Sequence, residues 1–344
     1  MQQTTIAVDL AKSVFQVAIS HRPGHVAEEH RLSRARFLRF LATRPAATVL
    51  LEACGSAHHW GRTIEQLGHT VRLLPPHETR RYVRRNKTDR TDAKALLEAA
   101  RNEEIHPVPV KSVPQQAVAS LHRVRTTWIR TRTARLNTLR GLLREFGVTI
   151  PVGARHVVPH VRAWLDDAEA PLPASLRPSL AALCEEIRTL EQRIKELERH
   201  LAAVAHQVPH VAHLRTIPGI GLLNATALVA CVGDIQRFPS GRHFASDLGL
   251  TPREYSSGAR RRLGAISQQG DRYRRTLFMH GARALRSHCR NPAKATPFRL
   301  WIRNIAARRG ANIATAAIAN RLARMVWRVW RDDRPFIAAT RVAA

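Results

Sequence analysis

Four acidic residues stand where carboxylates could do chemistry. Asp89 and Asp92 lie three apart in NKTDRTDAKAL (86–96), so a helix beginning there would carry both on one face. Asp9 in IAVDLA and Glu52 in VLLEACG each stand near the end of an apolar stretch. Converging carboxylates repel one another unless a cation neutralises them, and such hard oxygen ligands select Mg²⁺ or Mn²⁺. We therefore predict a catalytic metal site, in which two ions about 4 Å apart would assist phosphoryl transfer.

Each of these carboxylates also has a purely structural interpretation. Asp89 alone fits a helix N-cap, with Asp92 in the first turn, where the helix dipole favours negative charge. Asp9 and Glu52 are harder to explain in this way, because a carboxylate in an apolar strand has no local partner. Taken together, the four residues favour the metal site.

A second candidate group is a pair of serines in a basic stretch. Ser256 and Ser257 stand directly before Gly258 in REYSSGARRRLGAISQQGDRYRR, and three arginines (260–262) follow. A serine hydroxyl becomes a nucleophile when a base takes its proton and cations stabilise the charge that develops. The arginines suit the second task, and the four carboxylates are candidates for the first. An isolated S-S-G is ordinarily an exposed turn, so these residues alone do not establish a nucleophile.

The stretch RTIPGIGLLNATALVA (215–230) resembles a helix-hairpin-helix element. Gly219 and Gly221 would permit a tight turn whose backbone N–H groups approach a phosphate. An ordinary glycine-turned pair of helices is the alternative. The nucleic-acid contacts that we expect are Arg84, Arg85, Lys87, Gly219, Gly221, Arg260, Arg261, Arg262 and Arg272.

The first hundred residues have the element order of an RNase H-like mixed sheet. Three β-rich runs come first, and helical and apolar runs then alternate up to a final helix. In this topology the first and fourth strands are neighbours and the last helix packs beside them, so the four acids converge. The predicted strands are 4–10, 14–20, 25–32, 47–53 and 69–74, and the predicted helices are 34–43, 58–68 and 88–102.

The middle of the chain is predicted to be helical and basic. A helix over 113–147 is followed by a Pro-rich connection, and apolar residues then recur from Leu180 to Val204 at alternating steps of three and four. This seam fits an antiparallel hairpin inside one chain, a coiled coil between chains, or both at once. We predict three domains: 1–110 with the RNase H fold, 111–208 as a basic helix and coiled-coil connection, and 209–335 as a mostly helical C-terminal domain.

The overall charge indicates the class of partner. A formal net charge of +30 exceeds what solubility requires and suits a polyanion, with nucleic acid favoured over a membrane surface. No run approaches 18 apolar residues and the N-terminus lacks the order of a signal peptide, so we expect a cytoplasmic or nucleoid-associated protein without a membrane partner. The four cysteines form no C-x-x-C pattern and fit a reducing compartment.

Five stretches, in this order, resemble the DEDD-type insertion-sequence transposases of the bacterial IS one-ten family, most closely its IS eleven-eleven branch. The resemblance covers almost the whole chain. Where many relatives carry a lysine in an I-S-K-x-G block, this chain has Gln268. The stretches are IAVDLAKSVFQVAI, LLEACGSAHHW, NKTDRTDAKALLEAAR, LRTIPGIGLLNATALVACVGDIQRFPSGRHFASDLGLTPREYSSG and ISQQGDRYRRTLFMHGARA.

The resemblance implies an N-terminal RuvC-like domain whose carboxylates bind Mg²⁺ and a C-terminal transposase domain with a nucleophilic serine. The carboxylate set falls on Asp9, Glu52, Asp89 and Asp92; the serine falls on Ser257, with Ser256 in reserve. The family implies a structured bridge RNA that pairs with donor and target DNA. It also implies a homo-oligomer, dimer or tetramer, with carboxylates from one subunit and the serine from another.

Two other functions stay open at the level of sequence. One is a RuvC-like, metal-dependent, structure-selective nuclease that uses the carboxylates and water. The other is a non-catalytic nucleic-acid-binding protein, for which the positive charge alone would suffice.

Overall fold

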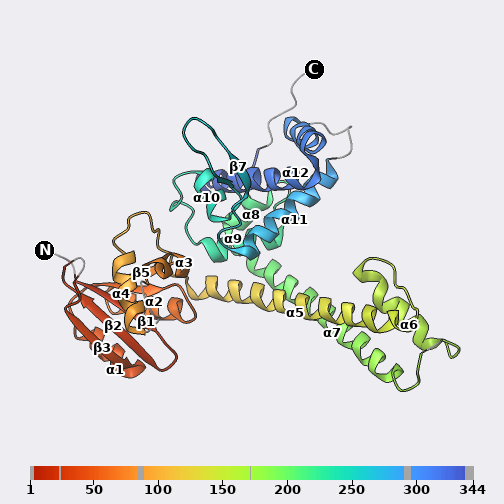
Figure 1. Cartoon of the computed structure of the whole chain (residues 1–344), viewed down its shortest axis with the longest axis horizontal. Helices are drawn as coiled ribbons and strands as arrows, with labels where there is room; N and C mark the ends of the chain where they lie inside the picture. Colours follow the sequence, from red (N-terminus) through yellow and green to blue (C-terminus); the bar gives the residue numbers. More distant parts are fainter. Residues whose placement is uncertain (1–3, 23–24, 84–88, 171, 290–295, 338–344) are drawn as a thin grey trace. The chain divides into compact units, whose positions relative to one another are not determined.

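The structure is a computed structural model that describes residues 4–22, 25–83, 89–170, 172–289 and 296–337; the side chains of Asp89, Arg90 and Pro209 also lie outside the description. The chain divides into two compact units, Met1–Gln115 and Gln116–Ala344. Figure 1 shows that the first is built around a sheet and that the second is mostly helical.

The N-terminal unit contains the predicted five-stranded mixed sheet, in the order β3-β2-β1-β4-β5. The first three strands are antiparallel neighbours, whereas β4 and β5 run parallel to β1. This arrangement confirms the RNase H-like topology. The strands are β1 (Thr5–Leu10), β2 (Val14–Ser20), β3 (Glu28–Ser33), β4 (Thr48–Glu52) and β5 (Thr70–Leu74).

Helices cover both faces of this sheet because its central strands are apolar on both sides. On one face, Ile6 and Val8 of β1 pack with α1 (Arg34–Ala42) and α2 (Ala57–Gln66). On the other face, Ala7 packs with α4 (Asp89–Ala99). The short helices α3 (Pro76–Thr79) and η1 (Arg80–Tyr82) precede α4.

Two long helices open the second unit. In α5 (Val113–Arg144), Leu136, Leu139 and Leu143 pack in one buried cluster with Leu180, Cys184 and Ile187 of α7 (Arg177–His206). Arg125–Glu198 and Arg135–Glu186 ion pairs, at 2.7 and 2.6 Å, join the same helices. The apolar seam of α7 is therefore buried within one chain, as in the intrachain alternative. Between the helices lie η2 (Ala154–His156) and α6 (Val157–Asp166).

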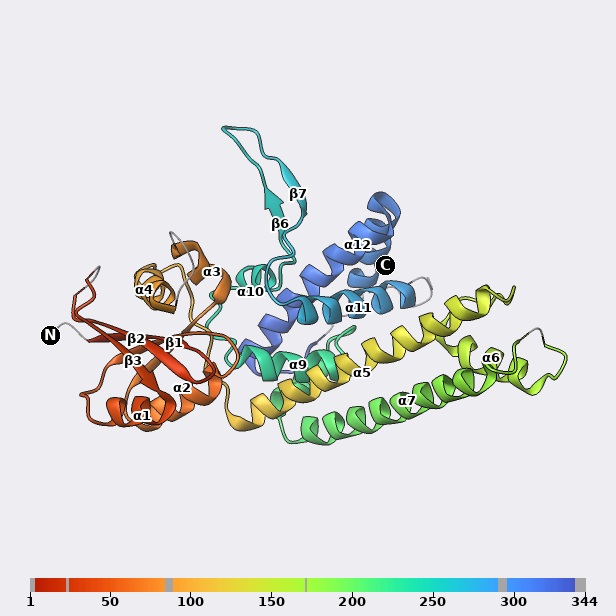
Figure 2. The same cartoon turned by 60° about the horizontal axis from the view of Figure 1, so that its bottom comes forward.

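The remaining elements pack around α12, whose buried residues share one core cluster with α9, α10 and α11. A two-stranded hairpin, β6-β7, projects from this core (Figure 2). The sequence did not indicate its strands, because their side chains are nearly all exposed and do not alternate. The elements are α8 (Pro209–Arg215), α9 (Leu222–Val232), α10 (Gly241–Asp247), β6 (Pro252–Glu254), β7 (Leu263–Ile266), α11 (Arg272–His288) and α12 (Pro297–Asp332), which kinks at Gly310.

A buried histidine joins α5, α9 and α11. His122 Nδ1 lies 2.8 Å from the Tyr273 hydroxyl and its Nε2 lies 3.0 Å from Thr226 Oγ1. The Thr226 hydroxyl donates its proton to the Leu222 carbonyl, so it accepts from Nε2–H, and Nδ1 then accepts from Tyr273. This arrangement uses neutral His122, and burial lowers the pKa of His122 to about 4.

None of the helices in the described residues combines the length and the apolar character needed to cross a membrane.

Candidate active site

Asp9 and Glu52 lie at neighbouring strand ends on the same face of the sheet. The parallel register pairs Val8 with Leu51, so Asp9 and Glu52 are the next residues along the two strands. Successive strand residues point to opposite faces. Ala7 and Leu50 pack on the α4 side of the sheet, so Asp9 and Glu52, two residues further along, face that side as well.

Cys54 gives independent support for the proximity of these two carboxylates. Loss of hydration, followed by the negative charges of Glu52 and Asp9, raises the pKa of the Cys54 thiol. Both acids therefore act on one sulfur atom. Asp9 and Glu52 thus lie near the same thiol, at one end of the sheet.

The third acid, Asp92, belongs to the helix that covers this face. Asp92 precedes Leu96 by four residues and Ala99 by seven, which places the three on one side of α4. Leu96 and Ala99 pack in the same buried cluster as Ala7 of β1. A 3.0 Å ion pair between Lys94 and Glu29 of β3 further holds α4 on the sheet. Asp92 therefore lies on the sheet-facing side of α4.

The remaining predicted residues near this site lie wholly or partly outside the described part of the chain. Asp89 begins α4, but its side chain lies outside the description, and so do Arg84, Arg85 and Lys87. Among the described side chains, no group of three or more His, Cys, Asp and Glu is arranged to hold a metal ion. The donor set itself fits a hard divalent cation, because it consists of carboxylate oxygens.

The predicted serines occupy the β6-β7 hairpin, within the second unit. Ser257 lies in the turn at its tip, where its backbone exchanges hydrogen bonds of 3.2 and 3.1 Å with Arg260. Gly258 adopts a φ of +55°, which glycine accepts without strain. Both serines are exposed, as are all three arginines, Arg260, Arg261 and Arg262, that follow the turn.

The two serines differ in their hydrogen bonds. The Ser256 hydroxyl donates to Glu254 Oε1 at 2.6 Å and accepts from the Arg262 backbone N–H at 3.1 Å. Among the described residues, the Ser257 hydroxyl makes no such bond. Ser256 thus holds the two sides of the hairpin together, whereas the Ser257 hydroxyl is accessible to a ligand. The sequence analysis did not include Glu254. Glu254 stands two residues before Ser256, and in an extended chain residues two apart lie on the same face.

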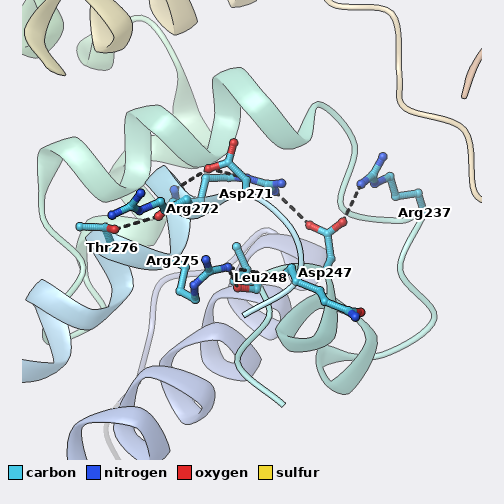
Figure 3. A network of polar contacts seen from close by, with 9 residues as sticks. Arg237, Asp247, Leu248, Asp271, Arg272, Arg275 and Thr276 are labelled. Atoms are coloured by element: carbon cyan, nitrogen blue, oxygen red, sulfur yellow. Dashed lines mark hydrogen bonds and ion pairs between the residues drawn. The ribbon is translucent and has the colours of Figure 1, made fainter. Parts of the chain in front are cut away.

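The base of the hairpin is a close contact between two backbone segments. A Cβ on Gly249 would lie 2.0 Å from the Gln269 carbonyl oxygen, and a Cβ on Gly270 would lie 2.0 Å from that of Asp247. Arg275 donates to the carbonyls of Leu248 and Gln269, and Figure 3 shows this network. The hairpin is therefore firmly fixed at its base while its tip is exposed.

Gly219 and Gly221 form the turn between α8 and α9, as the helix-hairpin-helix interpretation requires. Gly219 has a φ of +91°, and a Cβ there would lie 3.2 Å from the carbonyl oxygen of Gly281 in α11. A Cβ on Gly221 would meet nothing within 4 Å. Gly219 thus permits close packing on α11, and phosphate binding by this turn stays a prediction.

Comparisons with known proteins identify the class. A family model described as a DEDD transposase of the IS110 type matches residues 6–148, which include the sheet and all four acids. A second, described as "Transposase IS116/IS110/IS902 family", matches residues 211–297, which include the hairpin and α11. The first unit is therefore a RuvC-like DEDD transposase domain.

Three similar proteins extend over nearly the whole chain. A probable family 20 transposase of Pseudomonas aeruginosa is 43% identical over 328 residues, 95% of this chain and 96% of its own. The transposase for insertion sequence element IS1111A of Coxiella burnetii is 37% identical, with 94% and 88% covered. That for IS1328 of Yersinia enterocolitica is 35% identical, with 97% and 98% covered. The chain therefore belongs to the IS110/IS116/IS902 family and is a transposase, an enzyme that acts on DNA.

Proposed function

We propose that this transposase cuts and rejoins DNA through a covalent serine–phosphate intermediate, with Ser257 as the nucleophile. The bond between Oγ and phosphorus forms as one phosphorus–oxygen bond of the DNA backbone breaks, and the serine proton passes to a base. A DNA hydroxyl later attacks the phosphoserine, which rejoins a strand and restores the serine. The observation that carries this proposal is the exposed hairpin tip, where the Ser257 hydroxyl lies close in sequence to Arg260, Arg261 and Arg262.

Asp9, Glu52, Asp89 and Asp92 are proposed as the carboxylates that complete the chemistry. The placement of Asp9 and Glu52 at adjacent strand ends, and of Asp92 on the covering helix, supports this role. Mg²⁺ or Mn²⁺ held by this set would supply a Lewis acid for the phosphoryl oxygens. The carboxylates themselves would hold the cation, and one of them would accept the proton that the serine gives up.

A homo-oligomer, dimer or tetramer, is part of this proposal. The residues of the hairpin from 252 to 265 are exposed, and Glu254 is the one carboxylate that contacts its serines among the described residues. A nucleophile on such a surface needs a second surface to supply the base and exclude water. A composite site, with carboxylates from one subunit and Ser257 from another, meets this need. The long α5–α7 hairpin is the proposed subunit contact.

We further propose that a structured bridge RNA from the flank of the element guides the reaction by pairing with donor and target DNA. The net charge of +30 supports the binding of two nucleic acids at once, and it suits a protein associated with the nucleoid.

A recombination assay with purified protein, donor DNA, target DNA and flank-derived RNA tests these proposals separately. We expect recombinant DNA only when the RNA is present. The Ser257→Ala protein should give no recombinant DNA under any of these conditions. Ser256→Ala should retain activity, reduced through a looser hairpin. If Ser257→Ala recombines DNA while Ser256→Ala and Glu254→Gln do not, Ser256 is the nucleophile and Glu254 its base. Equal recombination with and without RNA would contradict the proposed RNA guidance and leave the serine mechanism standing.

A further inference from the structure

A groove with a cavity volume of about 270 Å³ lies along the first turns of α11, beside the end of the β6-β7 hairpin. Figure 2 shows α11 following the hairpin within the same unit. The groove combines positively charged side chains with two apolar ones. Its lining residues are Ile266, Gln268, Arg272, Arg275, Thr276, Met279, His280 and Arg283.

The positive charge of this groove is not neutralised by nearby acids. No acidic residue lines it. Asp271, which precedes Arg272, accepts from the Arg274 backbone N–H at 2.7 Å and lies 3.9 Å from Arg274 Nε. The half-buried Asp247 pairs with Arg274 at 3.0 Å and Arg237 at 3.4 Å. Figure 3 shows Asp247 on the Arg237 side of the network, with Arg272 on the opposite side. Within the described part of the chain, the side chains of Arg272 and Arg283 have no ion pair, so both are available to an anion.

The two arginines are spread along the helix rather than gathered at one point. Between Arg272 and Arg283 lie Thr276 and His280, at steps of four, four and three, and all four side chains are exposed. At about 1.5 Å per residue they cover about 16 Å. Phosphates of one strand recur about every 3.4 Å along a duplex, so this length matches several phosphates and exceeds a single phosphate ion.

The floor of the groove is apolar. Ile266 and Met279 are partly buried and pack against the core of the C-terminal unit. A sugar–phosphate backbone presents anionic groups on one side and apolar sugar faces on the other. The groove fits this combination better than it fits an isolated anion or an acidic peptide.

We propose that this α11 groove binds the sugar–phosphate backbone of a nucleic-acid strand next to the serine hairpin. Arg272 and Arg283 contact phosphates several nucleotides apart on the strand, and Arg275, which is held by the carbonyls of Leu248 and Gln269, presents a fixed cation between them. Because the groove begins where β7 ends, a bound strand is directed along the hairpin. This inference uses the membership of the transposase family and does not depend on which serine reacts.

Fluorescence anisotropy with labelled oligonucleotides tests the groove without any cleavage. The full-length protein is titrated in EDTA with single-stranded DNA, single-stranded RNA and duplex DNA of one sequence, at several salt concentrations. We expect Arg272→Gln and Arg283→Gln each to weaken binding roughly tenfold, as loss of a charged hydrogen bond would. Each should also reduce the slope of log K against log salt by about 0.7 for single strands or about 0.9 for duplex DNA.

Arg193→Gln is the matched control, because it removes the same charge from an exposed position of α7. The proposal is overturned if the groove variants match Arg193→Gln or the unaltered protein in affinity and slope. A larger effect on the DNA arm assigns the groove to DNA, and a larger effect on the RNA arm assigns it to the guide.

Gln268→Lys provides the opposite change and does not rely on loss of binding. It adds a cation to the groove, so we expect tighter binding and a salt slope steeper by about one contact. Unchanged binding by a folded Gln268→Lys protein would contradict the proposal. Because no serine or carboxylate of the proposed active site is altered and no strand is cut, failure here is distinct from failure of the serine mechanism.

Discussion

At the scale of single residues, the local position of each acid decides what it can do. Asp9 lies one residue before the end of β1 and Glu52 ends the parallel strand β4, both on the same face of the sheet, and Asp92 lies on the covering helix. Other acids nearby have structural partners: Glu29, for example, holds Lys94 at 3.0 Å. The assignment of Asp9, Glu52 and Asp92 to the active site therefore rests on their position at one end of the sheet.

Asp9→Asn and Glu52→Gln should each reduce DNA strand cleavage by at least roughly a hundredfold, because each removes a negative charge that a bound cation requires. Nucleic-acid binding in EDTA should change little. Glu65→Gln is the control, since Glu65 lies on the exposed surface of α2, the helix on the opposite face of the sheet. Cleavage by Asp9→Asn at the unaltered rate would contradict the assignment.

His122 should make the stability of the C-terminal unit depend on pH. Its folded pKa of about 4 lies below the ordinary 6.5, so the unfolded chain takes up a proton first as the pH falls. Protonation therefore favours unfolding between these values. The free energy of unfolding should fall by about 2 kcal/mol from pH 7 to pH 5 through this residue alone.

Urea denaturation at the two pH values, compared between the protein and His122→Gln, isolates this contribution. The variant should be less stable at pH 7, because it loses two buried hydrogen bonds, but its stability should fall less on acidification. An identical loss of stability in both proteins would contradict a neutral, buried His122.

At the scale of elements, the sheet was predictable from the sequence and the hairpin was not. Apolar runs of five to seven residues indicated β1, β2 and β4, and the predicted strand order made the strands of Asp9 and Glu52 neighbours. The register of the structure then places both residues on one face. The strands of the β6-β7 hairpin are short, exposed and without alternation. Their pairing depends instead on close backbone contacts at the hairpin base.

The polar contacts of the second unit were also beyond the sequence. Asp247 accepts a hydrogen bond from Arg274, 27 residues away, and, among the described residues, from none of the other arginines at the start of α11. Ser256 selects Glu254 only because the hairpin turns as it does. These pairings depend on the tertiary structure, and they determine which arginine side chains can contact the phosphates of a nucleic acid.

Gly270→Ala should destabilise the hairpin base. Gly270 has a φ of +89°, and an added Cβ would lie 2.0 Å from the Asp247 carbonyl oxygen. We expect the free energy of unfolding of the C-terminal unit to fall by more than about 2 kcal/mol, with a loss of recombination. Gly141→Ala is the control: this helical position is open, so alanine should stabilise the unit by about 0.5–1 kcal/mol. Equal stability of both variants would show that the close contact is absent.

At the scale of the whole molecule, the net charge of +30 determines how the transposase meets its substrates. Exposed arginines occur along α5, the hairpin and α11, so phosphates can be contacted at many positions. The charge itself does not read a base sequence. The proposed guide RNA would provide that selectivity, with the protein holding backbones.

Binding of the full-length protein to DNA should weaken steeply with salt, because each phosphate contact releases counterions. With six to ten contacts, affinity should fall by about a thousandfold or more between 50 and 200 mM salt. Filter binding in EDTA measures this without cleavage. A slope that corresponds to one or two contacts would contradict the proposed use of the charge.

The most direct test of the central claim is to trap and identify the covalent intermediate. Protein, RNA and a DNA substrate nicked beside the cleavage position are mixed with Mg²⁺, stopped with denaturant and analysed by tryptic mass spectrometry. We predict a nucleotide attached to Ser257, lost in Ser257→Ala and in Asp9→Asn but retained in Ser256→Ala. Strand cleavage with no adduct on any serine would contradict this account.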